Sequence, residues 1–148
     1  MIEKLNLPSF DCKITKIDGK DYIFDVIRLK NIFLTPEEWV RQHFIHLLLT
    51  NYQVPRTLIK LEGGLVYNKL SKRSDILVYN REGEPFLLVE CKRANVKIDK
   101  KVVNQVSIYN RKINASYVAI TNGLKTFCFE TKNNQQELIQ IADLPTFI

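Results

Sequence analysis

The chain has 148 residues, of which 45% are hydrophobic and 26% charged, and this composition suits one globular domain with its own core. No apolar run is long enough to span a membrane, and charges stand where a signal peptide needs an apolar segment, so we expect a cytoplasmic protein without a membrane partner. The net charge of +6 is compatible with nucleic acid, and three widely spaced cysteines argue against a disulfide framework or a paired-cysteine metal site.

The N-terminal third predicts a strand pair followed by a helix. A hairpin is predicted over KITKIDGKDYIFDVIRLK, with its turn at Asp18-Gly19 between alternating apolar residues. Thr35 is suited to cap a helix, Pro36 fits its first position, and acidic residues follow at the positive end of the helix dipole. Apolar residues then recur at helical spacing, with Trp39 and Phe44 expected in the core, until Thr50-Asn51.

The rest of the chain predicts a mixed sheet. Strands are expected over residues 65–70, 75–79, 86–91, 116–121, 125–130 and 137–141, and a helix over residues 99–113. The strand, helix, strand passage from residue 86 to 121 implies a parallel crossover. We therefore predict one α/β domain over residues 1–148: a mixed β-sheet flanked by helices, with a core over about residues 25–130 and an N-terminal hairpin before it.

The strand LLVECKR, residues 87–93, places an acid and a base on one face, because Glu90 and Lys92 are two apart in extended chain. Asp75 opens the preceding strand and comes close to Glu90 if the two strands pair. Two neighbouring carboxylates repel and are costly to desolvate unless a cation joins them, and an oxygen-preferring ion such as Mg²⁺, or alternatively Mn²⁺, meets that need. Lys92 beside the metal would help to activate water and to neutralise charge on phosphorus.

This arrangement resembles the D…ExK core of the PD-(D/E)xK nucleases. A second ExK, Glu130-Thr131-Lys132, is set aside because no aspartate opens a strand just before it. The order LTPEEWVRQHF, KRSDILVYN, FLLVECKR, NQVSIYN, YVAITNG resembles the N-terminal nuclease region of type I restriction enzyme R subunits, over about residues 25–130. The aspartate follows Ser74, where the family name has proline.

The resemblance implies a restriction-endonuclease-like fold and Mg²⁺-dependent hydrolysis of DNA. The metal would be held by Asp75, Glu90 and the carbonyl of Cys91, and Gln105 and Tyr109, four apart on the next helix, would position the substrate. It also implies an acid on the first helix, either Glu37 or Glu38. We prefer Glu38, which is equally suited to a capping box with Thr35.

Basic residues beside these motifs predict contacts with DNA phosphates: Lys72, Arg73, Arg93, Lys97 and Lys101, with Lys100 in the same strip. No G-x-x-x-x-G-K-[ST] loop is present, so we expect any DNA translocation to need a motor subunit. Motor or specificity subunits of a restriction system are therefore expected partners, and a homodimer is left open.

Three structural alternatives stand beside these functional interpretations. Glu90 and Lys92 are also compatible with a surface ion pair on an edge strand. Gln105 and Tyr109, taken alone, are an ordinary helix pair, and His43 and His46 lack a third metal ligand. A module of the same fold that binds nucleic acid or protein without cleavage, or a subunit active only with a partner, remains an alternative function.

Overall fold

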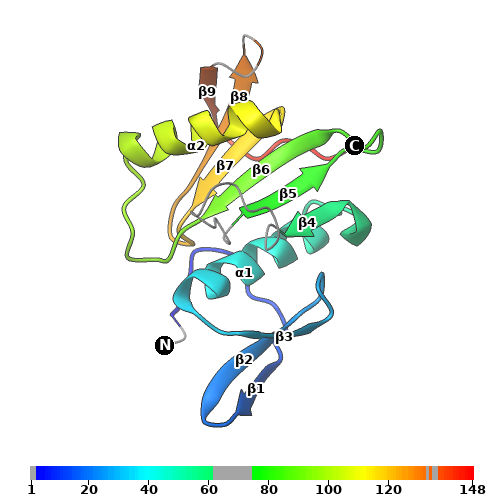
Figure 1. Cartoon of the computed structure of the whole chain (residues 1–148), viewed down its shortest axis with the longest axis vertical. Helices are drawn as coiled ribbons and strands as arrows, with labels where there is room; N and C mark the ends of the chain where they lie inside the picture. Colours follow the sequence, from blue (N-terminus) through cyan, green and yellow to red (C-terminus); the bar gives the residue numbers. More distant parts are fainter. Residues whose placement is uncertain (1–2, 62–74, 133, 135–136) are drawn as a thin grey trace.

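A computed structural model describes residues 3–61, 75–132, 134 and 137–148 of the chain (Figure 1). Within these ranges the fold is mixed α/β, as predicted, with two α-helices, a six-stranded sheet and a three-stranded sheet. The elements in chain order are β1 (Ile14–Ile17), β2 (Lys20–Asp25), β3 (Lys30–Phe33), α1 (Pro36–Thr50), a 3-10 turn (Arg56–Leu58), β4 (Ile59–Leu61), β5 (Asp75–Tyr79), β6 (Pro85–Cys91), α2 (Lys100–Ile113), β7 (Tyr117–Thr121), β8 (Thr126–Lys132) and β9 (Glu137–Ile141).

The N-terminal sheet has the order β1-β2-β3 and is antiparallel throughout. Asp18 and Gly19 form the predicted turn, with φ of 51° and 78°, the left-handed region that tight hairpin turns need. The third strand, β3, was not predicted. The chain reaches it through a turn at Asp25, whose Oδ1 accepts the backbone N–H groups of Ile27 and Arg28 at 2.8 Å each.

Helix α1 begins as its sequence predicts. Thr35 has extended backbone, and its hydroxyl accepts the N–H of Glu38 at 3.0 Å, while Pro36 occupies the first turn. The helix ends at Thr50, and the N–H of Asn51 still bonds to the Leu47 carbonyl.

The main sheet has the strand order β4-β5-β6-β7-β8-β9. Every neighbouring pair is antiparallel except β6 and β7, which are parallel and connected through α2, as the crossover predicted. Strand β4 was not predicted, and the predicted strand at residues 65–70 lies outside the described part of the chain. Strand β6, which carries the ExK motif, is interior.

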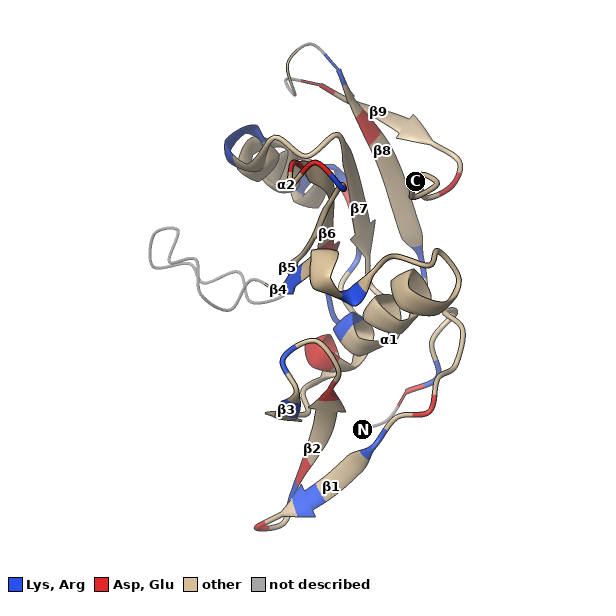
Figure 2. Cartoon of the chain, turned by 90° about the vertical axis from the view of Figure 1, so that its right-hand side faces the viewer, with Lys and Arg blue, Asp and Glu red and all other residues tan. Residues whose placement is uncertain are grey.

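The two helices cover opposite faces of this sheet, and the three-stranded sheet lies beyond α1 (Figure 2). The core on the α1 side contains Trp39 and Phe44, as predicted, together with Val89 and Cys91 of β6. The core on the α2 side contains Leu88 of β6. Since side chains alternate along a strand, Glu90 continues the row of Leu88 on the α2 side, and Lys92 follows directly after the strand ends at Cys91.

Neither described helix is long and apolar enough to cross a membrane. All three cysteines are free thiols, and Cys91 and Cys128 are buried within strands, as expected. Burial and the nearby Asp143 raise the pKa of Cys128 to about 11.

Candidate nuclease site at the end of β6

The acid and the base of the ExK motif form an ion pair whose carboxylate is buried. The Nζ of Lys92 lies 3.0 Å from Oε2 of Glu90, and the side chains are 22% and 1% exposed. Because β6 lies between β5 and β7, this is not a surface pair on an edge strand. The desolvation of a buried carboxylate can exceed what its partner charge returns, so this pair is weak evidence of a stabilising role.

The second ExK copy provides an internal comparison. Lys132 and Glu130 on β8 are 3.5 Å apart, with side chains 53% and 38% exposed. Identical spacing therefore produces a solvated pair on β8 and a desolvated pair on β6. Only the β6 copy has the burial that strengthens electrostatic interactions at a reacting group.

Asp75 is brought opposite Glu90 by the register of the sheet. It is the first residue of β5, and its Cα pairs with that of Glu90 in the antiparallel β5–β6 ladder. The strand pairing on which the sequence argument depended is therefore present.

The carboxyl ends of β6 and β7 meet at the same edge of the sheet. Cys91 pairs with Thr121 in the parallel ladder, and the N–H of Lys92 bonds to the Thr121 carbonyl at 2.8 Å. The backbone around Cys91, whose carbonyl is an expected metal ligand, is thus held on both sides by neighbouring strands.

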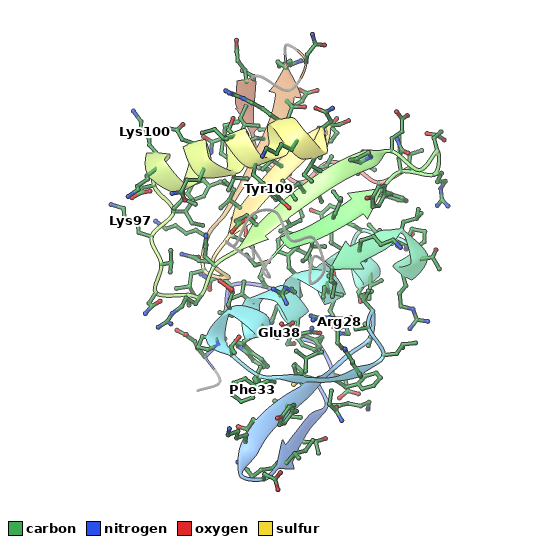
Figure 3. All side chains as sticks on the ribbon, viewed as in Figure 1. Arg28, Phe33, Glu38, Lys97, Lys100 and Tyr109 are labelled. Atoms are coloured by element: carbon green, nitrogen blue, oxygen red, sulfur yellow. The ribbon has the colours of Figure 1, made fainter. Side chains whose placement is uncertain are left out.

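The two acids of the first helix have different environments. Glu38 is 6% exposed, and its carboxylate accepts from Arg28 at 3.2 Å, Arg41 at 2.5 Å and Gln42 at 2.8 Å. Figure 3 shows Arg28 and Glu38 in the layer between α1 and the three-stranded sheet. This carboxylate therefore already has three donors in the fold, and the preference for Glu38 as the acid at the site stays a prediction.

Glu37, by contrast, interacts electrostatically with the ExK residues. Burial raises the pKa of Glu37, the positive charges of Arg41 and Lys92 lower it, and the negative charge of Glu90 raises it again. Glu37 thus lies within electrostatic range of both ExK residues. Sequence reasoning left the choice between neighbours open because both satisfy the helix start.

Glu38 belongs to a buried ionic network that the sequence did not reveal. Asp25 is fully buried; its Oδ2 accepts from Arg28 Nε and from Gln42 Nε2 at 2.9 Å each. Together with Glu38 and Arg41, the network contains two acids and two arginines, so its charges sum to zero. The network attaches the β2–β3 turn to α1 and so fixes the start of the helix that carries Glu37. Its sequence signals are local spacings: i, i+3 for Asp25–Arg28 and for Glu38–Arg41.

Gln105 and Tyr109 lie on α2, which covers the sheet face that carries Leu88. Tyr109 is half-buried against the α2-side core, and Gln105 is exposed. Figure 3 shows Tyr109 beneath α2, toward the sheet.

Of the predicted phosphate contacts, Arg93, Lys97 and Lys101 are exposed, and Lys72 and Arg73 lie outside the described residues. Lys97 and Lys100 project near the start of α2 (Figure 3). Arg93 Nε donates to Asn95 Oδ1 at 2.9 Å. These residues make the connection between β6 and α2 a basic segment immediately after the ExK motif.

The two histidines of α1 have packing roles. His43 Nδ1 is 2.8 Å from the Trp39 carbonyl, and Phe10 stacks on His46 at 4.1 Å. Burial lowers the pKa of both histidines. Among the described side chains, which do not include that of Asp75, no three His, Cys, Asp or Glu form a group able to hold a metal ion.

Comparison with known proteins identifies the family. A family model described as the type I restriction enzyme R protein N terminus matches residues 36–145. The match includes both helices and all six strands of the main sheet, and leaves out the three-stranded sheet. No curated protein and no solved structure gives a significant match. Since the matched segment spans most of the chain, the chain belongs to the type I restriction enzyme R protein N-terminus family.

Proposed function

We propose that this chain is a metal-dependent DNA endonuclease domain of the PD-(D/E)xK type. The observation that carries the proposal is the desolvated Glu90–Lys92 ion pair at the end of an interior strand, with Asp75 opposite Glu90 in register. Membership of the R protein N-terminus family supports the same assignment. An arrangement so costly to bury is typical of a site that works on charged substrate.

The ion that suits these residues is Mg²⁺, with Mn²⁺ as the alternative. The proposed ligands are the carboxylates of Asp75 and Glu90 and the carbonyl of Cys91, all oxygen donors of the kind that hard divalent ions prefer. Opposite residues in an antiparallel pair carry their Cβ atoms on one face, so the pairing supports including Asp75. A divalent ion would reduce the repulsion between the two carboxylates.

We assign the first-helix acid to Glu37. Glu38 is held by two arginines and an amide, whereas Glu37 is half-buried and interacts electrostatically with both Glu90 and Lys92. In this arrangement Glu38 fixes the helix and Glu37 helps to hold the metal or its water. Both acids thus contribute, but in different ways.

The reaction would be hydrolysis of a phosphodiester. When bound, the metal supplies Lewis acidity and a more acidic water. Lys92 would orient or deprotonate the attacking water and stabilise the negative charge that develops on the phosphate oxygens, and one ester oxygen would leave with a proton. Gln105 and Tyr109 would position the backbone of the substrate. The phosphate contacts would come from Lys72, Arg73, Arg93, Lys97 and Lys101.

A nicking assay with matched variants tests the proposal. Supercoiled plasmid and single-stranded DNA are incubated with the protein and Mg²⁺, Mn²⁺ or chelator. We expect metal-dependent cleavage that falls by roughly 100-fold or more in Lys92→Ala, since general acid–base and charge-stabilising groups contribute on this scale. Lys132→Ala, the same change in the exposed copy of the motif, should cleave like the wild type.

Two other results would assign a different role. DNA binding without cleavage, unchanged in Lys92→Ala, would identify a binding module. Cleavage that appears only when a motor or specificity subunit is added would identify a dependent nuclease subunit. The family description, which names the R protein of type I restriction enzymes, indicates which subunits to add in this second test.

A further inference from the structure

The turn that follows β7 is connected to the basic segment between β6 and α2 by one side chain. Asn122 is 7% exposed, and its Nδ2 donates to the Val96 carbonyl at 2.8 Å. Its Oδ1 accepts the N–H groups of Leu124 and Lys125 at 2.9 Å each. The amide therefore closes its own turn with one atom and holds a segment 26 residues away with the other.

The position that Asn122 holds lies between two of the basic residues. Val96 stands between Arg93 and Lys97, and its N–H bonds back to the Arg93 carbonyl at 3.0 Å. At the start of the same segment, the N–H of Lys92 bonds to Thr121. The segment of residues 92–99 is thus attached to the end of β7 at two points, one of them beside the ExK motif.

The turn itself is firmly held. Thr121 Oγ1 accepts the N–H of Gly123 at 3.0 Å. Asn6 donates its backbone N–H to the Gly123 carbonyl at 2.7 Å and its side-chain amide to the Leu124 carbonyl at 3.0 Å. Asn122 therefore connects the basic segment to a braced part of the fold and not to a free loop.

We propose that Asn122 is a positioning residue for the nucleic-acid substrate, which acts by holding Arg93 and Lys97 in place beside Lys92 to receive the phosphate backbone. This inference rests on the proposed function, because it assumes that DNA is the ligand. A segment ordered in advance does not lose conformational freedom when DNA binds, so its phosphate contacts count fully toward affinity. Without the anchor, binding must order the segment first.

Asn122→Asp separates this role from that of the turn. The carboxylate keeps the acceptor for Leu124 and Lys125, but it removes the donor to Val96 and sets an oxygen against that carbonyl. Asn95→Asp is the matched control. It adds one negative charge to the basic segment itself and keeps the acceptor for Arg93, so it reports the effect of charge without loss of the anchor. Asn122→Ala is the second variant, with Asn80→Ala as its control, because Asn80 closes a comparable turn at the far end of β6.

Binding is measured by fluorescence anisotropy with labelled duplex DNA in chelator, over a range of salt concentrations. We expect the Kd of Asn122→Asp to rise about fivefold to thirtyfold over that of Asn95→Asp, with a shallower dependence on salt, since fewer phosphate contacts form. Hydrogen exchange over residues 93–98 should become about tenfold faster or more, and kcat at saturating DNA should stay within about twofold.

The inference is overturned if Asn122→Asp binds like Asn95→Asp, if exchange over residues 93–98 is unchanged, or if the wild type does not bind DNA. Wild-type binding without metal-dependent cleavage would refute the nuclease alone. In that case affinity and exchange in the Asn122 variants still decide the positioning role, so the two failures are distinguishable.

Discussion

Replacing Glu37 and Glu38 by glutamine, one at a time, separates an effect on cleavage from an effect on the stability of the fold. The neighbours differ in what surrounds them: Glu38 lies in the buried ionic network, and Glu37 interacts with Glu90 and Lys92. We expect Glu38→Gln to destabilise the fold, and Glu37→Gln to abolish cleavage while the fold is retained.

The size of the first effect follows from burial. The side chain of Glu38 is 7% exposed and that of its partner Arg41 is 4% exposed. Removing one partner of a buried ion pair typically costs about 3–5 kcal/mol, because the other charge stays desolvated. At about 2–4 °C per kcal/mol for a domain of this size, Glu38→Gln should lower the Tm by roughly 6–20 °C.

Glu37→Gln should behave differently. Burial raises the pKa of Glu37, so a neutral side chain there removes a desolvation cost, and the Tm should change by less than the equivalent of about 1 kcal/mol. Cleavage should fall by roughly 100-fold, the scale expected for a group acting at the reacting phosphate. Thermal unfolding by circular dichroism and plasmid nicking measure the two properties separately.

Glu130→Gln is the control for the loss of any ExK acid, because an exposed pair contributes about 1 kcal/mol or less. A Glu38→Gln protein with wild-type Tm and no cleavage would show that Glu38 acts at the metal. Together with full cleavage by Glu37→Gln, that result would refute the assignment made from the structure.

Three further outcomes are expected. Burial lowers the pKa of His43, so the unfolded state binds a proton more readily than the folded state. The Tm should therefore fall as the pH drops from 7.5 to 5.5, and a constant Tm over this range would contradict a lowered pKa. Gly123→Ala should destabilise the fold by at least about 1–2 kcal/mol in denaturant titration, because φ is +83° and a Cβ would lie 2.8 Å from Leu5; wild-type stability would show that this turn relaxes freely. At pH 8 a maleimide should label the half-exposed Cys12 well before Cys128, whose buried thiol has a pKa of about 11; equal rates by mass spectrometry would refute this order.

Local signals in the sequence identified most elements because each rested on nearby residues. Asp18-Gly19 predicted the first turn, and Thr35-Pro36 predicted the start of α1. Strand β3 was missed because the turn before it depends on the Asp25 side chain bonding to backbone two and three residues on. Strand β4 has three residues, too few for alternation to be recognised.

The part of the candidate site that the sequence predicted is the part set by the alternation of side chains along a strand. Alternation alone places Glu90 and Lys92 on one face, and their ion pair agrees with that. The choice between Glu37 and Glu38 depends on Arg28, which arrives from a turn ten residues earlier in the chain. The anchor at Asn122 likewise joins segments that are distant in sequence and meet only because β6 and β7 are parallel neighbours.

Strand β6 contributes alternate side chains to the cores on its two faces, so the strand cannot gain or lose a single residue without exchanging them. Deleting one codon within residues 85–91 would turn every later side chain of the strand to the opposite face, so that the ExK carboxylate would enter the apolar layer under α1 and Cys91 would face α2. Such a deletion would damage folding and chemistry in a single step. Insertions and deletions should instead accumulate in the turn at residues 80–84 between β5 and β6. An insertion there leaves every side chain of β6 on its present face.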